Sequence, residues 1–96
     1  MDRIKEMSSI PYRTIMEFVP YGRQRGHSVC IAYGRSQVQP WAIGYQGVSN
    51  AYFSTIAETL AYAAGKNWIQ KHMISKQQYE VKQCYKAIFG QPYDGD

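Results

Sequence analysis

The chain has few of the residues on which catalytic and metal sites depend. Its 96 residues include two cysteines, two histidines and seven acidic residues. None of the motifs that mark zinc proteases, serine hydrolases, phosphate-binding loops or paired-cysteine zinc sites is present. Three glutamates have structural explanations as a strand exterior, a helix cap and a helix surface: Glu17, Glu58 and Glu80. We therefore expect a protein that is not an enzyme and that holds neither a cofactor nor a metal.

Two cysteines are too few for a disulfide-stapled scaffold. We interpret Cys30 and Cys84 as buried, reduced thiols. His27 lies three residues before Cys30, and an odd spacing on a strand places two side chains on opposite faces. A metal site made of these three residues and His72 would require separate elements to converge, so we favour four unrelated residues.

The sequence also lacks a hydrophobic run long enough to span a membrane. The first ten residues, MDRIKEMSSI, lack the apolar centre of a signal peptide, so we expect a cytoplasmic protein with no membrane partner. Hydrophobic residues make up 45% of the chain and charged residues 19%, a balance typical of one globular domain. We expect an N-terminal arm at residues 1–11, a single domain at residues 12–92 and a C-terminal tail at residues 93–96.

Three segments of the N-terminal half alternate with a period of two, which is typical of β-strands. They are residues 12–19, 27–34 and 41–48. Consecutive strands joined by short polar loops favour an antiparallel meander. Gly44 leaves one face of the third strand bare, so we expect an alanine-lined helix to approach there. A turn from Gly47 to Tyr52 would lead into this helix.

A helix is predicted from Ser54 to Met73. Thr55, followed three residues later by Glu58, is the capping-box pattern that marks a helix start. At about 100° per residue, one apolar stripe of this helix would face a partner surface. The stripe comprises Ile56, Ala57, Leu60, Ala61, Ala64 and Trp68, whereas Thr59 is expected on the other side.

A second helix is predicted after Ser75, which with Gln78 repeats the capping pattern. Its apolar face comprises Val81, Cys84, Tyr85 and Ile88. Gly90 just past its end, followed by Pro92, is a good stop signal. The predicted fold is therefore α+β, with a three-stranded antiparallel sheet followed by two helices packed on one face (βββαα).

Positive charge and tyrosine are the two features in excess. The net charge is +4, and nine Tyr, three Phe and two Trp exceed the needs of so small a core. Tyrosine is common at half-buried contact surfaces, and paired arginines in a Gly22–Gly26 loop can grip phosphates or acidic groups. The alternative for the loop is that it only keeps the protein soluble. The candidate binding residues are Tyr21, Arg23, Arg25, Arg35, Tyr45, Tyr52 and Lys66, with Tyr33 as a further candidate for stacking.

Two resemblances follow from these patterns. Strands followed by a helix, with a Gly- and Arg-bearing first loop, resemble the double-stranded-RNA-binding domain from its first strand onwards. That family has a lysine cluster at the start of its last helix, where this chain has residues 54–57 (STIA), so the resemblance implies topology rather than RNA binding. The stretch from Trp41 to Leu60, with W-x-I-G-Y and then Phe-Ser-Thr before a helix, is similar to small phage and mobile-element proteins, anti-CRISPRs among them. This second resemblance implies a protein that occupies a surface on a host complex.

Three functions remain open from the sequence. The leading expectation is a phage-type binding protein that inhibits or modulates a host protein or nucleoprotein complex through tyrosines and basic loops. The alternative is a nucleic-acid-binding domain that uses Arg23, Arg25 and Arg35. The third is a small enzyme or ligand-binding domain that uses His27 or His72. A homodimer is also expected to be possible, since an edge strand presents unpaired amides.

Overall fold

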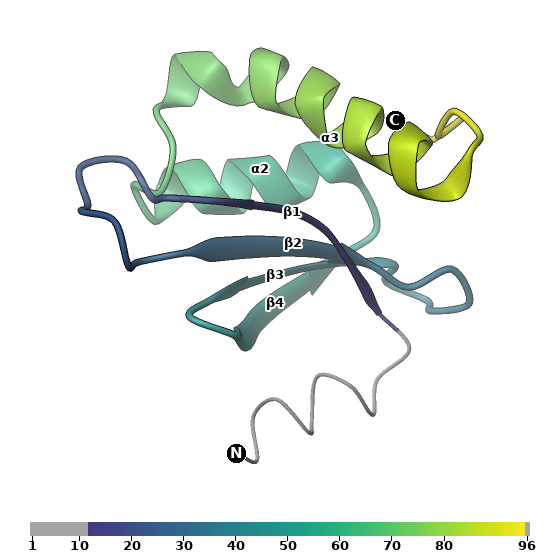
Figure 1. Ribbon diagram of the computed structural model, residues 1–96, viewed down its shortest axis with the longest axis horizontal. Coiled ribbons are helices and arrows are strands. Elements are labelled where there is room, and N and C mark those ends of the chain that lie inside the picture. The colour runs from purple at the N-terminus through teal and green to yellow at the C-terminus, as the bar shows by residue number, and fades with distance from the viewer. Residues whose placement is uncertain (1–11, 96) are drawn as a thin grey trace.

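The computed structural model describes residues 12–95, so the expected N-terminal arm lies outside the described residues. Four strands form one antiparallel sheet in the order β1-β2-β3-β4 (Figure 1). The strands are β1 (Arg13–Phe18), β2 (Val29–Tyr33), β3 (Trp41–Tyr45) and β4 (Val48–Phe53). They are followed by α2 (Ile56–Gly65), the 3₁₀ helix η1 (Lys71–Met73) and α3 (Ile74–Phe89). Both helices pack on one face of the sheet. The α+β class is confirmed, whereas the three-stranded sheet is wrong.

The fourth strand occupies the segment expected to be a turn. Tyr45 pairs with Val48, so only Gln46 and Gly47 connect β3 to β4. Both connecting residues have positive φ, 54° and 80°, as a tight primed hairpin turn requires. Asn-Gly is the familiar signature of such a turn, and Gln-Gly gives a weaker signal. The chain therefore reverses at once, and the remaining residues before α2 pair with β3.

The helix predicted to reach Met73 ends much earlier. α2 stops at Gly65, and Asn67 takes the left-handed conformation at φ 63°. The amide of Trp68 then donates to the carbonyl of Ala63 at 2.9 Å, which closes the helix end. Asparagine is one of the few residues that adopts this conformation readily, so Asn67 was the available stop signal.

The buried face of α2 is also rotated from the predicted stripe. Its buried residues are Ile56, Thr59, Leu60 and Ala63, whereas Ala57 and Ala61 are exposed. Thr59 can be buried because its hydroxyl donates to the carbonyl of Thr55 at 2.8 Å. Ile56, Leu60 and Ala63, rather than Ala57 and Ala61, therefore form the core-facing side of α2.

α3 begins at Ile74, one residue before the predicted cap, and no side chain caps its N-terminus. Its end at Phe89 and the left-handed Gly90, with φ 76°, confirm the predicted stop. Its predicted apolar face is confirmed, with Val81 and Tyr85 buried and Cys84 and Ile88 packed against the core. α3 crosses β1, whereas α2 covers β3 and β4.

The core lies between the two helices and one face of the sheet. Its largest fully buried side chains include Ile31, Trp41, Ile43, Leu60 and Val81. In β1 the pairing register shifts between Thr14 and Met16. Because of this bulge Ile15 is buried and Met16 also packs against the core, so the simple alternation predicted for residues 12–19 is wrong.

The cap of α2 gives a first testable prediction. The Thr55 hydroxyl accepts from the amide of Glu58 at 3.1 Å and donates to its carboxylate at 3.0 Å, which confirms the predicted capping pair. Replacement of Thr55 by alanine is expected to lower the free energy of unfolding by about 1 kcal/mol, since the amide loses its partner. Urea denaturation measures this loss, and Thr55→Ser should retain most of the stability. An unchanged urea midpoint for Thr55→Ala would show that the cap contributes nothing.

Candidate functional site

The candidate binding residues lie at different places on the sheet. In an antiparallel meander the β1–β2 loop and the β3–β4 turn share one end, and the β2–β3 loop lies at the other. Arg23 and Arg25 therefore stand at one end and Arg35 at the opposite end (Figure 1). Tyr52 pairs with Ala42, and its ring lies 5.4 Å from that of Tyr12. The structure does not bring the predicted set together in one patch.

We call the first of these ends the loop end, made of residues 19–28, the β3–β4 turn and the α2–η1 connection at residues 66–70. The amide of Tyr21 donates to the carbonyl of Trp68 at 2.6 Å, which ties the β1–β2 loop to the helical layer. Gln46 fixes the other side of the loop. Its Oε1 accepts from the amide of Ser28 at 2.6 Å, and its Nε2 donates to the carbonyl of Gly26 at 3.2 Å. The arginine-bearing loop is thus anchored at both of its sides.

Exposed charge and one exposed ring stand on this anchored loop. Arg23 and Arg25 are exposed, and the side chain of Tyr21 is 58% exposed. Lys66 is exposed at the C-terminus of α2, with its Nζ 5.6 Å from the centre of the Tyr62 ring. Within residues 12–95 none of these three cations forms an ion pair. The loop end therefore offers positive charge to a partner without first having to break an internal ion pair.

Tyr45, in contrast, is committed to internal contacts. Its ring stacks on Trp68, with centroids 5.7 Å apart and an interplanar angle of 12°. Its hydroxyl lies 2.6 Å from Nδ1 of His27. Trp68 in turn meets the edge of Tyr62 at 5.8 Å. These contacts join β3 to the β1–β2 loop and to the α2–η1 connection, so Tyr45 contributes to the packing of the loop end.

Aromatic residues are also used for internal packing at the opposite end of the sheet. Five rings pack together there: Tyr33, Trp41, Tyr85, Phe89 and Tyr93. Burial, with the neighbouring Tyr85 and Tyr93, raises the pKa of Tyr33, so its phenol stays neutral. Among the described aromatic residues only Tyr21 and Tyr79 are exposed. Of the four tyrosines predicted for a contact surface, Tyr33, Tyr45 and Tyr52 are therefore half-buried in packing contacts, and only Tyr21 is exposed.

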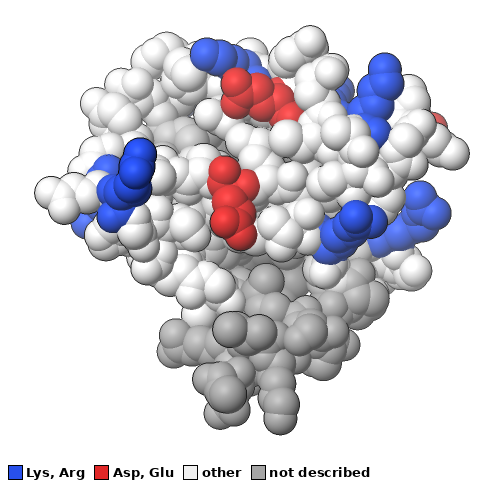
Figure 2. All heavy atoms as spheres, in the orientation of Figure 1, with Lys and Arg blue, Asp and Glu red and all other residues white. Residues whose placement is uncertain are grey.

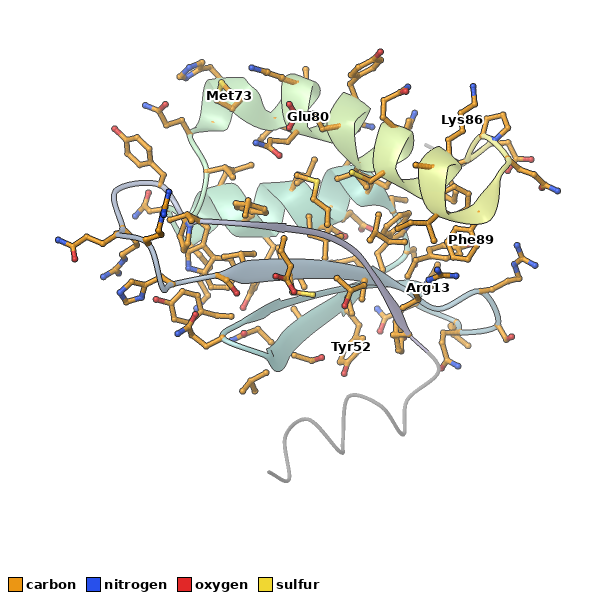
Figure 3. The ribbon with its side chains drawn as sticks, in the orientation of Figure 1. Arg13, Tyr52, Met73, Glu80, Lys86 and Phe89 are labelled. Carbon is orange, nitrogen blue, oxygen red and sulfur yellow. The ribbon has the colours of Figure 1, made fainter. Side chains whose placement is uncertain are left out.

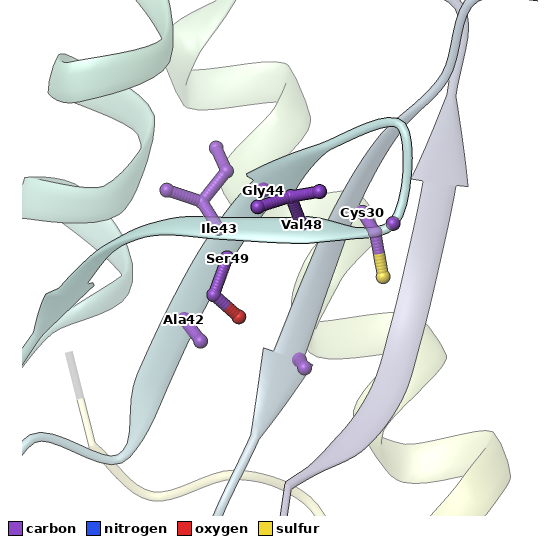
Figure 4. Close-up of a pocket in the computed structure, with 8 residues that line it drawn as sticks. Cys30, Ala42, Ile43, Gly44, Val48 and Ser49 are labelled. Atoms are coloured by element: carbon purple, nitrogen blue, oxygen red, sulfur yellow. The ribbon is translucent and has the colours of Figure 1, made fainter. Parts of the chain in front are cut away.

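The helix-free face of the sheet holds a cavity of about 10 Å³, lined mainly by β3 and β4 (Figure 4). That volume is room for about one water molecule, too little for a ligand. A Cβ on Gly44 would overlap the carbonyl oxygen of Val48. A backbone therefore does come close to Gly44, as predicted, but it belongs to β4, and the expectation of a helix there is wrong.

Cys30 borders this cavity and is a poor nucleophile. It is 8% exposed, and its sulfur lies 3.4 Å from the hydroxyl of Thr14. Burial raises the pKa of the Cys30 thiol, and the nearby Glu17 acts in the same direction. Within residues 12–95 no three His, Cys, Asp or Glu side chains gather closely enough to hold a metal ion.

A shallow groove of about 320 Å³ lies between α2 and the start of α3. It is lined by Ala61, Ala64, Gly65, Lys71 and Ile74. A Cβ on Gly65 would meet nothing within 4 Å, so this part of the groove is open. The α2–η1 connection joins the groove to the loop end. No sequence pattern indicated this groove, because it exists only where η1 turns the chain back over α2.

Basic side chains stand at both ends of the face shown in Figure 2, and acidic side chains lie between them. No helix within residues 12–95 has the length and apolar character needed to cross a membrane. Comparisons of the chain with models of known families, with curated proteins and with solved structures found no significant match.

Proposed function

We propose that the chain is a non-enzymatic binding protein whose loop end contacts an acidic surface on a protein partner and so modulates that partner. The observation that carries this proposal is the anchored β1–β2 loop, which presents Arg23, Arg25 and the exposed ring of Tyr21 together. Tyrosine and arginine are the residues that most often dominate the affinity of a protein interface. Anchoring the loop lowers the entropy lost when a partner binds. The phage-type origin suggested by the sequence resemblance is part of the same proposal.

A protein partner is favoured over nucleic acid by the state of the tyrosines. Binding of unpaired bases depends on aromatic faces that are free to stack. Tyr45 is stacked on Trp68, and Tyr52 is half-buried beside Tyr12. The neighbouring groove, with alanine and glycine walls and Lys71 at its rim, suits an apolar side chain beside an acidic one. Such a groove is typical of contacts with protein, whereas the packed tyrosines leave few ring faces for bases to stack on.

The experiment is an affinity purification from a nuclease-treated host lysate. It compares the wild type with the double variant Arg23→Ala/Arg25→Ala. We expect one stoichiometric protein to bind the wild type and to bind the variant about tenfold or more weakly, because two interface arginines are removed. The matched control is Lys76→Ala/Lys82→Ala, which removes the same charge from α3. A partner retained equally by both variants would contradict the assignment of the loop end.

The nucleic-acid alternative predicts that the chain binds DNA or RNA and that the Arg23→Ala/Arg25→Ala variant loses this binding. Phosphate contacts make affinity fall steeply with ionic strength, by a factor that grows with the number of contacts. Anisotropy titrations with single- and double-stranded DNA and RNA at low and near-physiological salt measure this dependence. Strong, salt-sensitive binding lost in the Arg23→Ala/Arg25→Ala variant would replace the protein partner with nucleic acid.

A further inference from the structure

A second arginine pair lies at the end of the sheet opposite the loop end. The guanidinium carbon of Arg13 is 5.5 Å from the centre of the Phe89 ring, and that of Arg35 is 5.7 Å from the same point. Arg13 begins β1, Arg35 follows β2, and Phe89 is the last residue of α3, so three separate elements meet here. Figure 3 shows Arg13 and Phe89 beside each other at this corner.

Two arginines bring positive charge to this corner. Neither Arg13 nor Arg35 forms an ion pair with any residue between 12 and 95. Lys86 adds a third cation in the last turn of α3. The C-terminal end of a helix carries a partial negative charge of about one half, which offsets only a fraction of this. Any repulsion between the two guanidinium groups falls when an anion binds near them.

The ring of Phe89 also prepares the two arginines for binding. A guanidinium group attracted to an aromatic ring has fewer conformations to lose when it engages a ligand. Contact with the ring leaves N–H groups of the fork available for an oxyanion. Arginine binds phosphate in two-pronged geometry, and a phosphate dianion matches the charge of two arginines better than a single carboxylate does.

We propose that Arg13 and Arg35, supported by Phe89, form a binding site for a phosphate monoester or free phosphate. This site is separate from the loop end and does not depend on the protein-binding proposal. The sequence indicated a binding role for Arg35 but placed it with Arg23 and Arg25. Arg13 gave no signal, because its position over Phe89 follows from how β1 lies beneath the end of α3.

The test is a titration of the full chain with inorganic phosphate at constant ionic strength, followed by NMR of the arginine Nε–Hε groups. We expect saturable shifts of Arg13 and Arg35, and about tenfold weaker binding of acetate, a monoanion. A phosphoserine peptide forms the second arm. Tighter binding of the peptide than of phosphate would make a phosphorylated protein the source, and equal binding would make it free phosphate.

Two variants complete the experiment. Arg13→Gln/Arg35→Gln should weaken phosphate binding about tenfold or more, whereas Lys76→Gln/Lys82→Gln, with the same charge removed from α3, should leave it unchanged. The wild-type titration decides the question even if a variant is poorly folded. Shifts that rise linearly without saturation, or that spread equally over all arginines, would mean general ion screening and would overturn the site.

Discussion

Replacement of Trp41 by alanine is expected to remove about 3–5 kcal/mol from the free energy of unfolding. Trp41 is fully buried, and its ring lies 4.8 Å from that of Tyr33 and 5.3 Å from that of Tyr93. Its indole N–H donates to the hydroxyl of Tyr93 at 3.2 Å. Alanine would leave a large cavity where β3 meets the end of α3, and it would remove that hydrogen bond.

Such a loss is a large part of the stability of a domain of this size, roughly 5–15 kcal/mol. The melting temperature should fall by roughly 15–30 °C, which calorimetry or circular dichroism can measure. If the alanine variant does not fold, Trp41→Phe and Tyr93→Phe keep the prediction testable. Tyr93→Phe removes only the hydrogen bond and is expected to lose about 1 kcal/mol. A Trp41→Ala variant as stable as the wild type would show that this cluster does not hold the fold.

The packing of Tyr93 against the core could not be predicted from the sequence. Residues 93–96 are expected from the sequence to form a C-terminal tail. In the structure the chain turns after Gly90, and the Tyr93 ring packs on Trp41 and Tyr85. No local pattern indicates such a return, since it depends on the distance between the end of α3 and the start of β3. The aromatic excess therefore suggested an exposed surface where the structure has internal packing.

Local signals, in contrast, were reliable where a short-range contact decides the conformation. The Thr55–Glu58 cap, the stop at Gly90 and the apolar face of α3 all depend on residues within about two turns of each other. Two of the missed features are of another kind. The burial of Thr59 depends on how α2 sits on the sheet, and the place of Arg13 depends on the path of β1 beneath α3.

In the candidate sites, too, features set by the local sequence were predicted and features set by tertiary contacts were not. The exposed Arg23 and Arg25 were predicted from a glycine-flanked loop, and the loop is where the sequence placed it. Its anchoring through Trp68 and Gln46 required the tertiary structure, because both partners are distant in the sequence. The separation of Arg35 from this loop follows from strand order alone, and a correct reading of the meander would have found it.

Replacement of Gly44 by alanine is expected to lower the free energy of unfolding by about 3 kcal/mol or more, the upper part of the range for overpacked interiors. An added Cβ would overlap the carbonyl oxygen of Val48 and lie 2.9 Å from the Cα of Ser49. These are backbone atoms, so no side-chain rotation can relieve the overlap. β4 would have to move away from β3, beside the tight turn at Gln46 and Gly47, where the pairing register already shifts.

The matched control is Gly65→Ala, in α2. Gly65 has no positive φ, and its added Cβ would meet nothing within 4 Å. That variant should be neutral or more stable by up to about 1 kcal/mol, because alanine restricts the unfolded chain. Urea denaturation of both variants compares the same chemical change in crowded and open surroundings. Equal midpoints would contradict the close approach of β4 to Gly44, whereas a loss confined to Gly44→Ala would establish that contact between β3 and β4 as the reason for glycine at this position.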